Sequence, residues 1–247
     1  MGASGLIALA GLATAGATAG YLFWRRIWFF RNPSRRPPAD AGILSPADGT
    51  VVYVRTVAPA EEVVAIKQGV RATIADILRE DVDEPKLVIG IFMSPFDVHY
   101  NRAPLDASVG FIRHYPAHGK NAYMASMHLR TLFKRAPYYA GSEHIVRNER
   151  TVTHFVGEHH GAPISVYVVQ IGARTVNGIE SYFRPGDRIA RGETFGMIRV
   201  GSQVDLIVPQ RATFIARVKP GDRVRSGETV VVSEQGNDPL VCCPSDA

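Results

Sequence analysis

Pro-Gly-Asp-Arg-Ile-Ala-Arg-Gly-Glu-Thr, residues 185–194, recurs at residues 220–229 as Pro-Gly-Asp-Arg-Val-Arg-Ser-Gly-Glu-Thr. Each copy predicts a strand, a glycine-containing turn and a second strand, a unit typical of barrel-sandwich folds. Carrier domains with this fold present a lysine at an exposed turn, but residues 190–191 and 225–226 contain none. We therefore interpret the repeat as part of a β scaffold and not as the attachment site of a swinging arm.

Short β-branched runs separated by Gly, Pro and Asp extend from the repeat back to residue 43. The runs at residues 50–54, 86–92 and 164–171 predict strands, and residues 73–80 predict a helix. Residues 115–139 show little two-residue periodicity, so we expect a loop or mobile lid there. The sequence thus predicts a mainly β (α+β) fold, with a barrel-sandwich-like β domain at residues 43–247.

The N-terminal region has the pattern of a membrane anchor. No charged residue occurs in residues 1–24, a length that can span a bilayer as a transmembrane helix. Tyr21, Trp24 and Trp28 then occupy the position of an interfacial aromatic belt. We assign residues 1–28 to the anchor and residues 29–42 to a basic linker. A cleaved signal peptide is the alternative, but it needs positive charge before the apolar stretch, and none precedes residue 25.

Charge and composition limit the partners and the compartment. The formal net charge is +5, and five arginines lie within residues 25–36, directly after the apolar stretch. This position predicts a domain on the cytoplasmic side of the inner cell membrane, and it does not suggest nucleic acid as a partner. Cys242 and Cys243 are the only cysteines, so no disulfide framework is expected. The histidines lack the spacing of a zinc site, and we expect no metal.

Six segments occur in an order that matches one enzyme family. They are Phe29-Phe30-Arg31-Asn32-Pro33, Ser45-Pro46-Ala47-Asp48-Gly49, the run Met-Ser-Pro-Phe-Asp-Val-His-Tyr-Asn-Arg-Ala-Pro at residues 93–104, Asn148-Glu149-Arg150, Gln170-Ile171-Gly172-Ala173, and the run Ile-Arg-Val-Gly-Ser-Gln-Val-Asp at residues 198–205. On these segments the chain resembles phosphatidylserine decarboxylase proenzymes of the short bacterial and archaeal type. The resemblance extends over roughly residues 29–209. Each segment is weakly specific alone, whereas the ordered combination is specific.

The resemblance implies self-cleavage between Gly201 and Ser202, into fragments 1–201 and 202–247 that stay together. The Ser202 hydroxyl would attack the Gly201 carbonyl, and Ser202 would end as a covalent pyruvoyl group. Glycine suits its position because it leaves the carbonyl accessible and tolerates a strained turn. The pyruvoyl carbonyl would bind the serine amine of a phospholipid and accept electrons as CO2 leaves. Phosphatidylserine would thereby become phosphatidylethanolamine.

The same resemblance assigns roles to two further residues. His99 is expected to protonate the substrate α-carbon or to recognise the substrate carboxylate, because histidine titrates near neutral pH. Asp48 is expected to orient the base of self-cleavage. An aspartate before a glycine is also the usual residue of a turn, so that reading of Asp48 stays open.

The identity of the base is open as well. Long forms of the family have a second histidine three residues after the first, where this chain has Arg102. His114 and His118 are alternatives for the base. Arg102 and Asn101 are expected to bind the phosphate or carboxylate of the substrate.

Two other functions remain open. The substrate could be a related serine lipid such as archaetidylserine, because its head group has the same chemistry. Alternatively, the chain is a non-catalytic, membrane-tethered carrier or scaffold domain built on the repeat. The sequence leaves the oligomeric state open, a homo-oligomer included.

Overall fold

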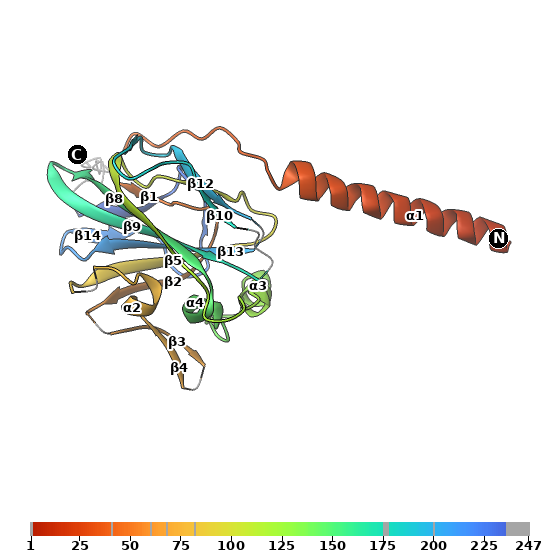
Figure 1. The fold of residues 1–247 in the computed structure, drawn as a ribbon, viewed down its shortest axis with the longest axis horizontal. Helices are drawn as coiled ribbons and strands as arrows, with labels where there is room; N and C mark the ends of the chain where they lie inside the picture. The colour runs from red at the N-terminus through yellow and green to blue at the C-terminus, as the bar shows by residue number, and fades with distance from the viewer. Residues whose placement is uncertain are drawn as a thin grey trace, which may run out of the picture.

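The computed structural model describes residues 2–40, 42–59, 61–67, 69–81, 83–174, 178–199 and 201–235. A long N-terminal helix extends away from a β domain (Figure 1). It comprises α1 (Ala3–Phe23) and a π-helical continuation, η1 (Trp24–Trp28). The most apolar window within Ser4–Trp28 has a mean hydropathy of 1.6, and none of it is buried. Its length and composition allow a membrane span, although an N-terminal signal sequence passes the same test.

An eight-stranded antiparallel sheet forms the centre of the domain, in the order β11-β7-β8-β9-β13-β5-β2-β15. Its strands are β2 (Gly49–Val57), β5 (Lys86–Met93), β7 (Ala107–Tyr115), β8 (Arg150–His159), β9 (Ala162–Gly172), β11 (Arg188–Ile189), β13 (Ser202–Pro209) and β15 (Arg223–Val224). At the start of β13, Ser202 pairs with Met93 of β5 and with Gly172 of β9. Ser202 therefore begins a strand that has a neighbour on both sides.

Three smaller sheets and three short helices complete the domain. The sheets are β1 (Ile43–Leu44) with β16 (Val230–Glu234) and β14 (Phe214–Ala216), β10 (Ile179–Ser181) with β12 (Thr194–Ile198) and β6 (Tyr100–Arg102), and the hairpin of β3 (Glu62–Lys67) and β4 (Val70–Thr73). The helices are α2 (Ile74–Ile77), α3 (Ala125–Leu132) and α4 (His144–Arg147).

Apolar cores cover both faces of the large sheet. On β13, Val204 and Leu206 belong to one core and Ile207 belongs to the other, as the alternation of side chains along a strand requires. The first core also contains Phe195 of β12 and Val232 of β16, so the two three-stranded sheets close it. Residues of α2, α3, α4 and the β3-β4 hairpin close the second core.

The predicted mainly β fold is confirmed, and β2, β5 and β9 contain the three predicted strands. The helix expected at residues 73–80 is shorter, because Thr73 caps it and it ends at Ile77. The expectation of an irregular segment at residues 115–139 is wrong in part, since α3 lies within it. A two-residue periodicity indicates strands and not helices, so its absence left this helix undetected. Only Met127 of α3 is buried, so the helix also has no stripe of buried apolar side chains that would indicate it.

The two strands of each sequence repeat do not pair with each other. In the first copy β11 pairs with β7, whereas β12 pairs with β10 and β6. In the second copy β15 pairs with β2, whereas β16 pairs with β1 and β14. Each copy therefore connects the large sheet to a small sheet. This arrangement differs from a hairpin with a projecting tip.

Each repeat also packs against one of two similar segments, Ser-Pro-Ala-Asp-Gly-Thr-Val at residues 45–51 and Ala-Pro-Leu-Asp-Ala-Ser-Val at residues 103–109. Arg223 pairs with Thr50 in one half, and Arg188 pairs with Ser108 in the other. The domain is thus built from two halves with matching contacts. Ser226, in the turn of the second repeat, is fully buried.

Candidate active site

The junction between Gly201 and Ser202 has an unusual backbone. Gly201 has φ +72°, in the left-handed region that only glycine occupies without strain. Its carbonyl oxygen accepts a hydrogen bond from the N–H of Ala173, at 3.2 Å. An N–H at this oxygen polarises the carbonyl and stabilises negative charge that develops on it during nucleophilic attack.

The Ser202 hydroxyl is buried and free. Ser202 is 0% exposed, and its Oγ has no hydrogen-bond partner within the described part of the chain. A buried hydroxyl without a partner costs about 1–3 kcal/mol and calls for a functional explanation. Because Ser202 directly follows the polarised carbonyl of Gly201, attack by this hydroxyl on that carbonyl is the chemistry that the arrangement favours.

His99 is a buried imidazole with one free nitrogen. Its Nδ1–H donates to the carbonyl of Asp97 at 2.9 Å, and its Nε2 has no partner among the described residues. The ring packs against Phe29, with 4.5 Å between ring centroids. Burial lowers the pKa of His99 from 6.5 to about 4. His99 is therefore neutral at pH 7 with an unprotonated Nε2, and the same burial makes it a weaker base than an exposed histidine, which the sequence did not reveal.

Two adjacent connections bring His99 and Ser202 to the same part of the domain. One leads from Met93 to His99, and the other leads from Ile198 to Ser202. They are joined at both ends, because Met93 pairs with Ser202 and the N–H of Ile198 donates to the carbonyl of His99. Ser202, the predicted nucleophile, thus lies at one end of the two paired connections, and His99, the predicted catalytic histidine, lies at the other.

Asp97 fixes the connection that carries His99. Its carboxylate accepts a hydrogen bond from the N–H of Ser94 at 2.8 Å and forms an ion pair with Arg223 of β15. Asp97 lies in the motif that points to His99, but sequence reasoning gave it no role of its own. Its partner Arg223 is distant in the sequence, so no local pattern could identify the pair.

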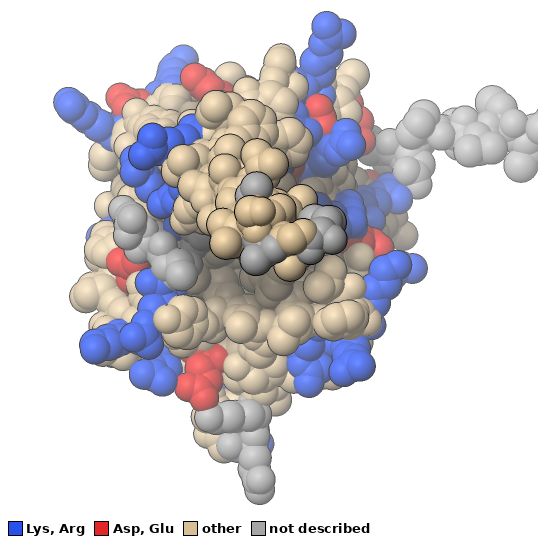
Figure 2. Space-filling model, turned by 90° about the vertical axis from the view of Figure 1, so that its right-hand side faces the viewer, with Lys and Arg blue, Asp and Glu red and all other residues tan. Residues whose placement is uncertain are grey.

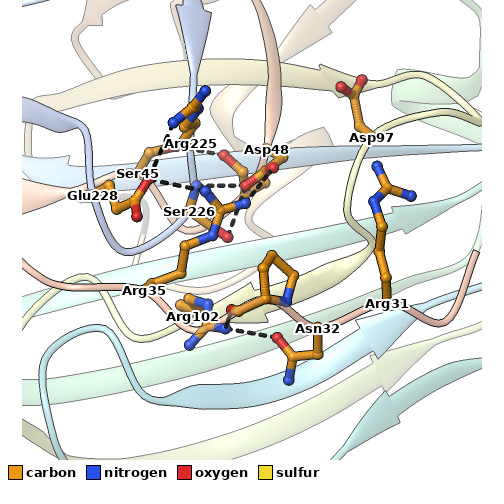
Figure 3. Close-up of polar contacts among 12 residues, drawn as sticks. Arg31, Asn32, Arg35, Ser45, Asp48, Asp97, Arg102, Arg225, Ser226 and Glu228 are labelled. Atoms are coloured by element: carbon orange, nitrogen blue, oxygen red, sulfur yellow. Dashed lines mark hydrogen bonds and ion pairs between the residues drawn. The ribbon is translucent and has the colours of Figure 1, made fainter. Parts of the chain in front are cut away.

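Asp48 contacts a turn and an arginine. One oxygen accepts hydrogen bonds from the N–H and Oγ of Ser226, at 2.8 and 2.9 Å, and the other pairs with Arg35 at 2.8 Å. Figure 3 shows Arg35 lying between Asp48 and Glu228. No described histidine bonds to Asp48, so its expected part in orienting a base has no direct contact behind it.

The matching half of the domain explains the bond from Asp48 to the turn. There Asp106 accepts the N–H of Arg191 at 2.9 Å, which is the equivalent contact at the equivalent position. Capping the turn is thus a feature of the fold in both halves. The second bond of Asp48, to Arg35, fixes the segment that follows the N-terminal helix.

Arg102 and Asn101 also bond within the protein. The terminal nitrogens of Arg102 donate to the carbonyls of Gly192 and Pro33 and to the side chain of Asn32. Asn101 is fully buried and accepts a hydrogen bond from Gln170 at 2.8 Å. Both side chains were expected to bind substrate, but their contacts favour a role in holding the segment after the anchor and the core beside Ser202.

A pocket of about 250 Å³ opens beside the junction. Its lining residues are Phe92, Pro95, Tyr123, Met124, Ala125, His128, Ala173 and Gly201. His128, on α3, is the histidine that lines this pocket, and its Nδ1 has no partner among the described residues. The sequence offered no signal for His128, because its position depends on how α3 packs.

The two histidines proposed as alternative bases lie elsewhere. His114, on β7, contacts Thr151 and Glu149, and His118 contacts Arg79. None of these partners lines the pocket beside Gly201. His128 lines that pocket, and His99 lies on the connection that pairs with the one leading to Ser202, whereas His114 and His118 do neither.

A second buried polar group lies on the opposite face of β13. Gln203 donates to Tyr53 and to Asp205, each at 2.8 Å, and accepts from His144 at 2.9 Å. Burial raises the pKa of Asp205 to about 6 and lowers the pKa of His144 to about 4. Gln203 directly follows Ser202, so this network fixes the start of β13. Polar residues at alternate positions of a buried central strand are the sequence signal that could have indicated it.

Comparison with known proteins finds matches over most of the chain. The family profile for phosphatidylserine decarboxylase matches residues 22–232. The chain is 35% identical over 185 residues to a protein of Methanopyrus kandleri that is provisionally named an archaetidylserine decarboxylase proenzyme, covering 74% of this chain and 70% of that protein. It is 34% identical over 185 residues to the phosphatidylserine decarboxylase proenzyme of Trichlorobacter lovleyi, covering 74% and 66%. It is 32% identical over 209 residues to that of Mycobacterium marinum, covering 84% and 69%. The chain thus spans about two thirds of the length of the curated relatives it matches.

Proposed function

Because this chain belongs to the phosphatidylserine decarboxylase family, we propose that it is a membrane-associated decarboxylase of a serine phospholipid. In this proposal the chain cleaves itself between Gly201 and Ser202, and Ser202 becomes a pyruvoyl group. The observation that carries it is the free, buried Ser202 hydroxyl directly after a glycine carbonyl that an N–H polarises. The naming of the relatives as proenzymes agrees with processing.

Self-cleavage assigns a step to each group at the junction. The Ser202 Oγ forms a bond to the Gly201 carbonyl carbon, the peptide C–N bond breaks, and the Ser202 nitrogen takes a proton. Neutral His99 accepts the hydroxyl proton at Nε2, and the N–H of Ala173 stabilises the oxyanion. A base then removes the proton from the Ser202 Cα, a Cα=Cβ double bond forms as the Cβ–Oγ bond breaks, and Gly201 leaves as a carboxylate. Water hydrolyses the remaining enamine and expels ammonia.

The pocket residues would then serve the decarboxylation. A pyruvoyl group at residue 202 supplies a carbonyl that withdraws electrons from the substrate α-carbon as CO2 leaves. His128 is one candidate for the proton that the α-carbon must receive, since its Nδ1 has no partner among the described residues. His99 is the other, and it could donate from Nε2 only after that nitrogen has taken up a proton, for instance from the substrate amine. The apolar walls beside Gly201 exclude water from the reacting atoms.

The sheet explains how two fragments could stay together. Residues 202–209 form β13, and both of its neighbours, β5 and β9, belong to the fragment 1–201. Backbone cleavage before Ser202 leaves these ladders intact. The Gln203 network adds contacts from Tyr53 and His144 of the larger fragment.

The proposed location is the inner membrane, with α1 as anchor and the β domain on the cytoplasmic side. The apolar length of Ser4–Trp28 and the arginines that follow it support this orientation. The proposed substrate is phosphatidylserine. Archaetidylserine is the alternative, because one relative carries that name and the head group is shared.

Intact-mass spectrometry of the purified protein tests the proposal. Residues 202–247 make up 46 of the 247 residues of a 27.0 kDa chain, so a fragment of about 5 kDa is expected, with a pyruvoyl group at its start. Ser202→Ala should give one uncleaved, inactive chain. An active protein that remains a single 27.0 kDa chain would contradict the mechanism. A single inactive chain that is otherwise folded would favour the scaffold alternative.

A further inference from the structure

Large apolar side chains gather in one exposed region of the β domain. Seven such side chains outside the N-terminal helix are exposed in the described chain, and five of them lie on α3, beside it or in the loop after β5. They are Phe96 at 66%, Tyr123 at 60%, Leu129 at 52%, Leu132 at 62% and Phe133 at 62%. Soluble proteins rarely leave such a group uncovered, so this α3 surface requires a partner.

The α3 surface is continuous with the membrane helix. The ring of Phe96 lies 6.4 Å from that of Trp24 in η1, and Arg31 donates to the carbonyl of Phe96 at 2.5 Å. A second pocket, of about 310 Å³, has Phe96 on one side and Leu132 of α3 on the other. In Figure 1, α3 lies on the side of the domain from which α1 emerges. A bilayer that contains α1 would therefore meet α3.

The charge of this region fits an anionic lipid surface. Residues 107–142 contain five Lys or Arg and no Asp or Glu. Arg130, Lys134 and Arg135 form no ion pair among the described residues, and Arg135 lies over the ring of Phe133. In Figure 2, which faces this side, the N-terminal helix projects toward the viewer in the middle, and Lys and Arg lie around it. Basic side chains around exposed apolar groups are typical of proteins that lie on a membrane interface.

The α3 surface also borders the entrance to the cleavage site. Tyr123, Met124 and His128 form one wall of the pocket that ends at Gly201. His128 and Phe92 line both this pocket and the one between Phe96 and Leu132. A head group that leaves the lipid surface beside α3 would thus reach Gly201 without crossing bulk water.

We propose that α3 and Phe96 form a second membrane contact, which rests on an anionic bilayer. The serine head group would then pass directly from this bilayer into the Gly201 pocket. The proposal rests on the proposed function for the identity of the head group. The membrane contact itself does not depend on catalysis, so the two can be tested separately.

The depth of α3 in vesicles is the direct test. A spin label is attached to Phe133→Cys in the full chain, with Cys242→Ser and Cys243→Ser, and the protein is reconstituted in vesicles of phosphatidylcholine and phosphatidylglycerol. The label should collide more with oxygen, which concentrates in lipid, than with a nickel chelate, which stays in water. The control is Val156→Cys, because Val156 is 42% exposed and lines a pocket with Asp106, Glu158 and Glu193. Its label should stay aqueous.

Two outcomes would overturn the proposal. A Phe133 label as accessible to the nickel chelate as the Val156 label would place α3 in water. A label shielded from both reagents would mean that protein, such as a second copy of this chain, covers the surface.

Activity on two forms of the substrate gives a second test. Leu129→Asp/Phe133→Asp changes two exposed side chains outside both pockets. Self-cleavage and turnover of a short-chain, water-soluble phosphatidylserine should change less than about twofold. Turnover in vesicles should fall at least about tenfold, because burying one large apolar side chain in lipid strengthens binding by about that factor. Equal turnover in vesicles by variant and wild type would refute the proposal. Loss of self-cleavage in the wild type would instead refute the proposed function and leave the depth measurement valid.

Discussion

Arg35→Ala should lower the free energy of unfolding by about 3 kcal/mol. Arg35 pairs with Asp48 at 2.8 Å and with Glu228 at 2.9 Å, and the exposed fractions of the three side chains are 8%, 12% and 30%. Removing one partner of a buried ion pair costs about 3–5 kcal/mol, because the remaining charge stays buried. We expect the lower end of that range, since Ser226 still bonds Asp48 and Glu228 can reach water.

The measurement is urea unfolding of the full chain in mild detergent, with Ser202→Ala in every protein to exclude cleavage. Both tryptophans lie in η1, and Trp24 contacts Phe29 and Phe96, so their fluorescence reports on that contact and not on the strands of the β domain. Far-ultraviolet circular dichroism follows the strands instead. Arg36→Ala is the matched control, because Arg36 is exposed and a surface substitution changes stability by about 0.5 kcal/mol or less.

A double variant separates the pair from the fold around it. Asp48→Asn combined with Arg35→Ala should cost less than the sum of the single changes, because the uncompensated charge is gone. If Arg35→Ala unfolds at the same urea concentration as Arg36→Ala, residues 29–42 are a free linker and our account of Arg35 is wrong.

Four further predictions follow from the site. Burial lowers the pKa of His99 to about 4. The rate of self-cleavage of the freshly translated chain should therefore stay constant from pH 8 to about pH 5 and fall to half near pH 4. A rate that falls to half near pH 6.5 would refute His99 as a buried base. Gly201→Ala places an alanine at φ +72°, which costs about 1–2 kcal/mol, and it should slow self-cleavage as followed on denaturing gels. Gly119→Ala is the control, because Gly119 has φ +83° and no atom lies near the added Cβ, and it should leave the cleavage rate unchanged. The pKa of Asp205 is raised to about 6, so the folded state binds the Asp205 proton more tightly than the unfolded state does. The free energy of unfolding should therefore fall by up to about 3 kcal/mol as pH rises from about 4 to about 8. Asp205→Asn, measured in the Ser202→Ala background, should lack this fall, and parallel pH curves for the two proteins would contradict the assignment. Deleting residues 1–24 should preserve cleavage, whereas deleting residues 1–30 removes Phe29 from the His99 ring and should slow it; equal rates on gels would show that Phe29 is unnecessary.

Local sequence patterns predicted the strands because local physics determines them. The β-branched runs at residues 86–92 and 164–171 become β5 and β9, which are buried on both faces of the sheet. The repeat predicted two strand–turn–strand units correctly. It could not indicate that their strands pair with different sheets, since register depends on residues 45–51 and 103–109, which are distant in the sequence.

Polar contacts between distant segments were not predictable in the same way. Arg102 looked like a ligand for an anionic substrate, yet it bonds Asn32, Pro33 and Gly192, which only the folded chain brings near it. The low pKa of His99 comes from burial beneath Phe29, a residue seventy positions away. A motif therefore identifies which residue types do the chemistry, but the protonation state depends on the packing around them.

One loop connects the membrane side of the molecule with the proposed base. The segment from Ser94 to His99 is held at three points: Phe96 contacts Trp24 of η1, Asp97 pairs with Arg223 of β15, and His99 packs on Phe29. Two of these partners, Trp24 and Phe29, belong to the anchor or directly follow it. Of the two, Phe29 contacts the imidazole itself, so a displacement of Phe29 would move the His99 ring. The segment from Ser94 to His99 thus links the proposed lipid contact at Phe96 with the proposed base at His99.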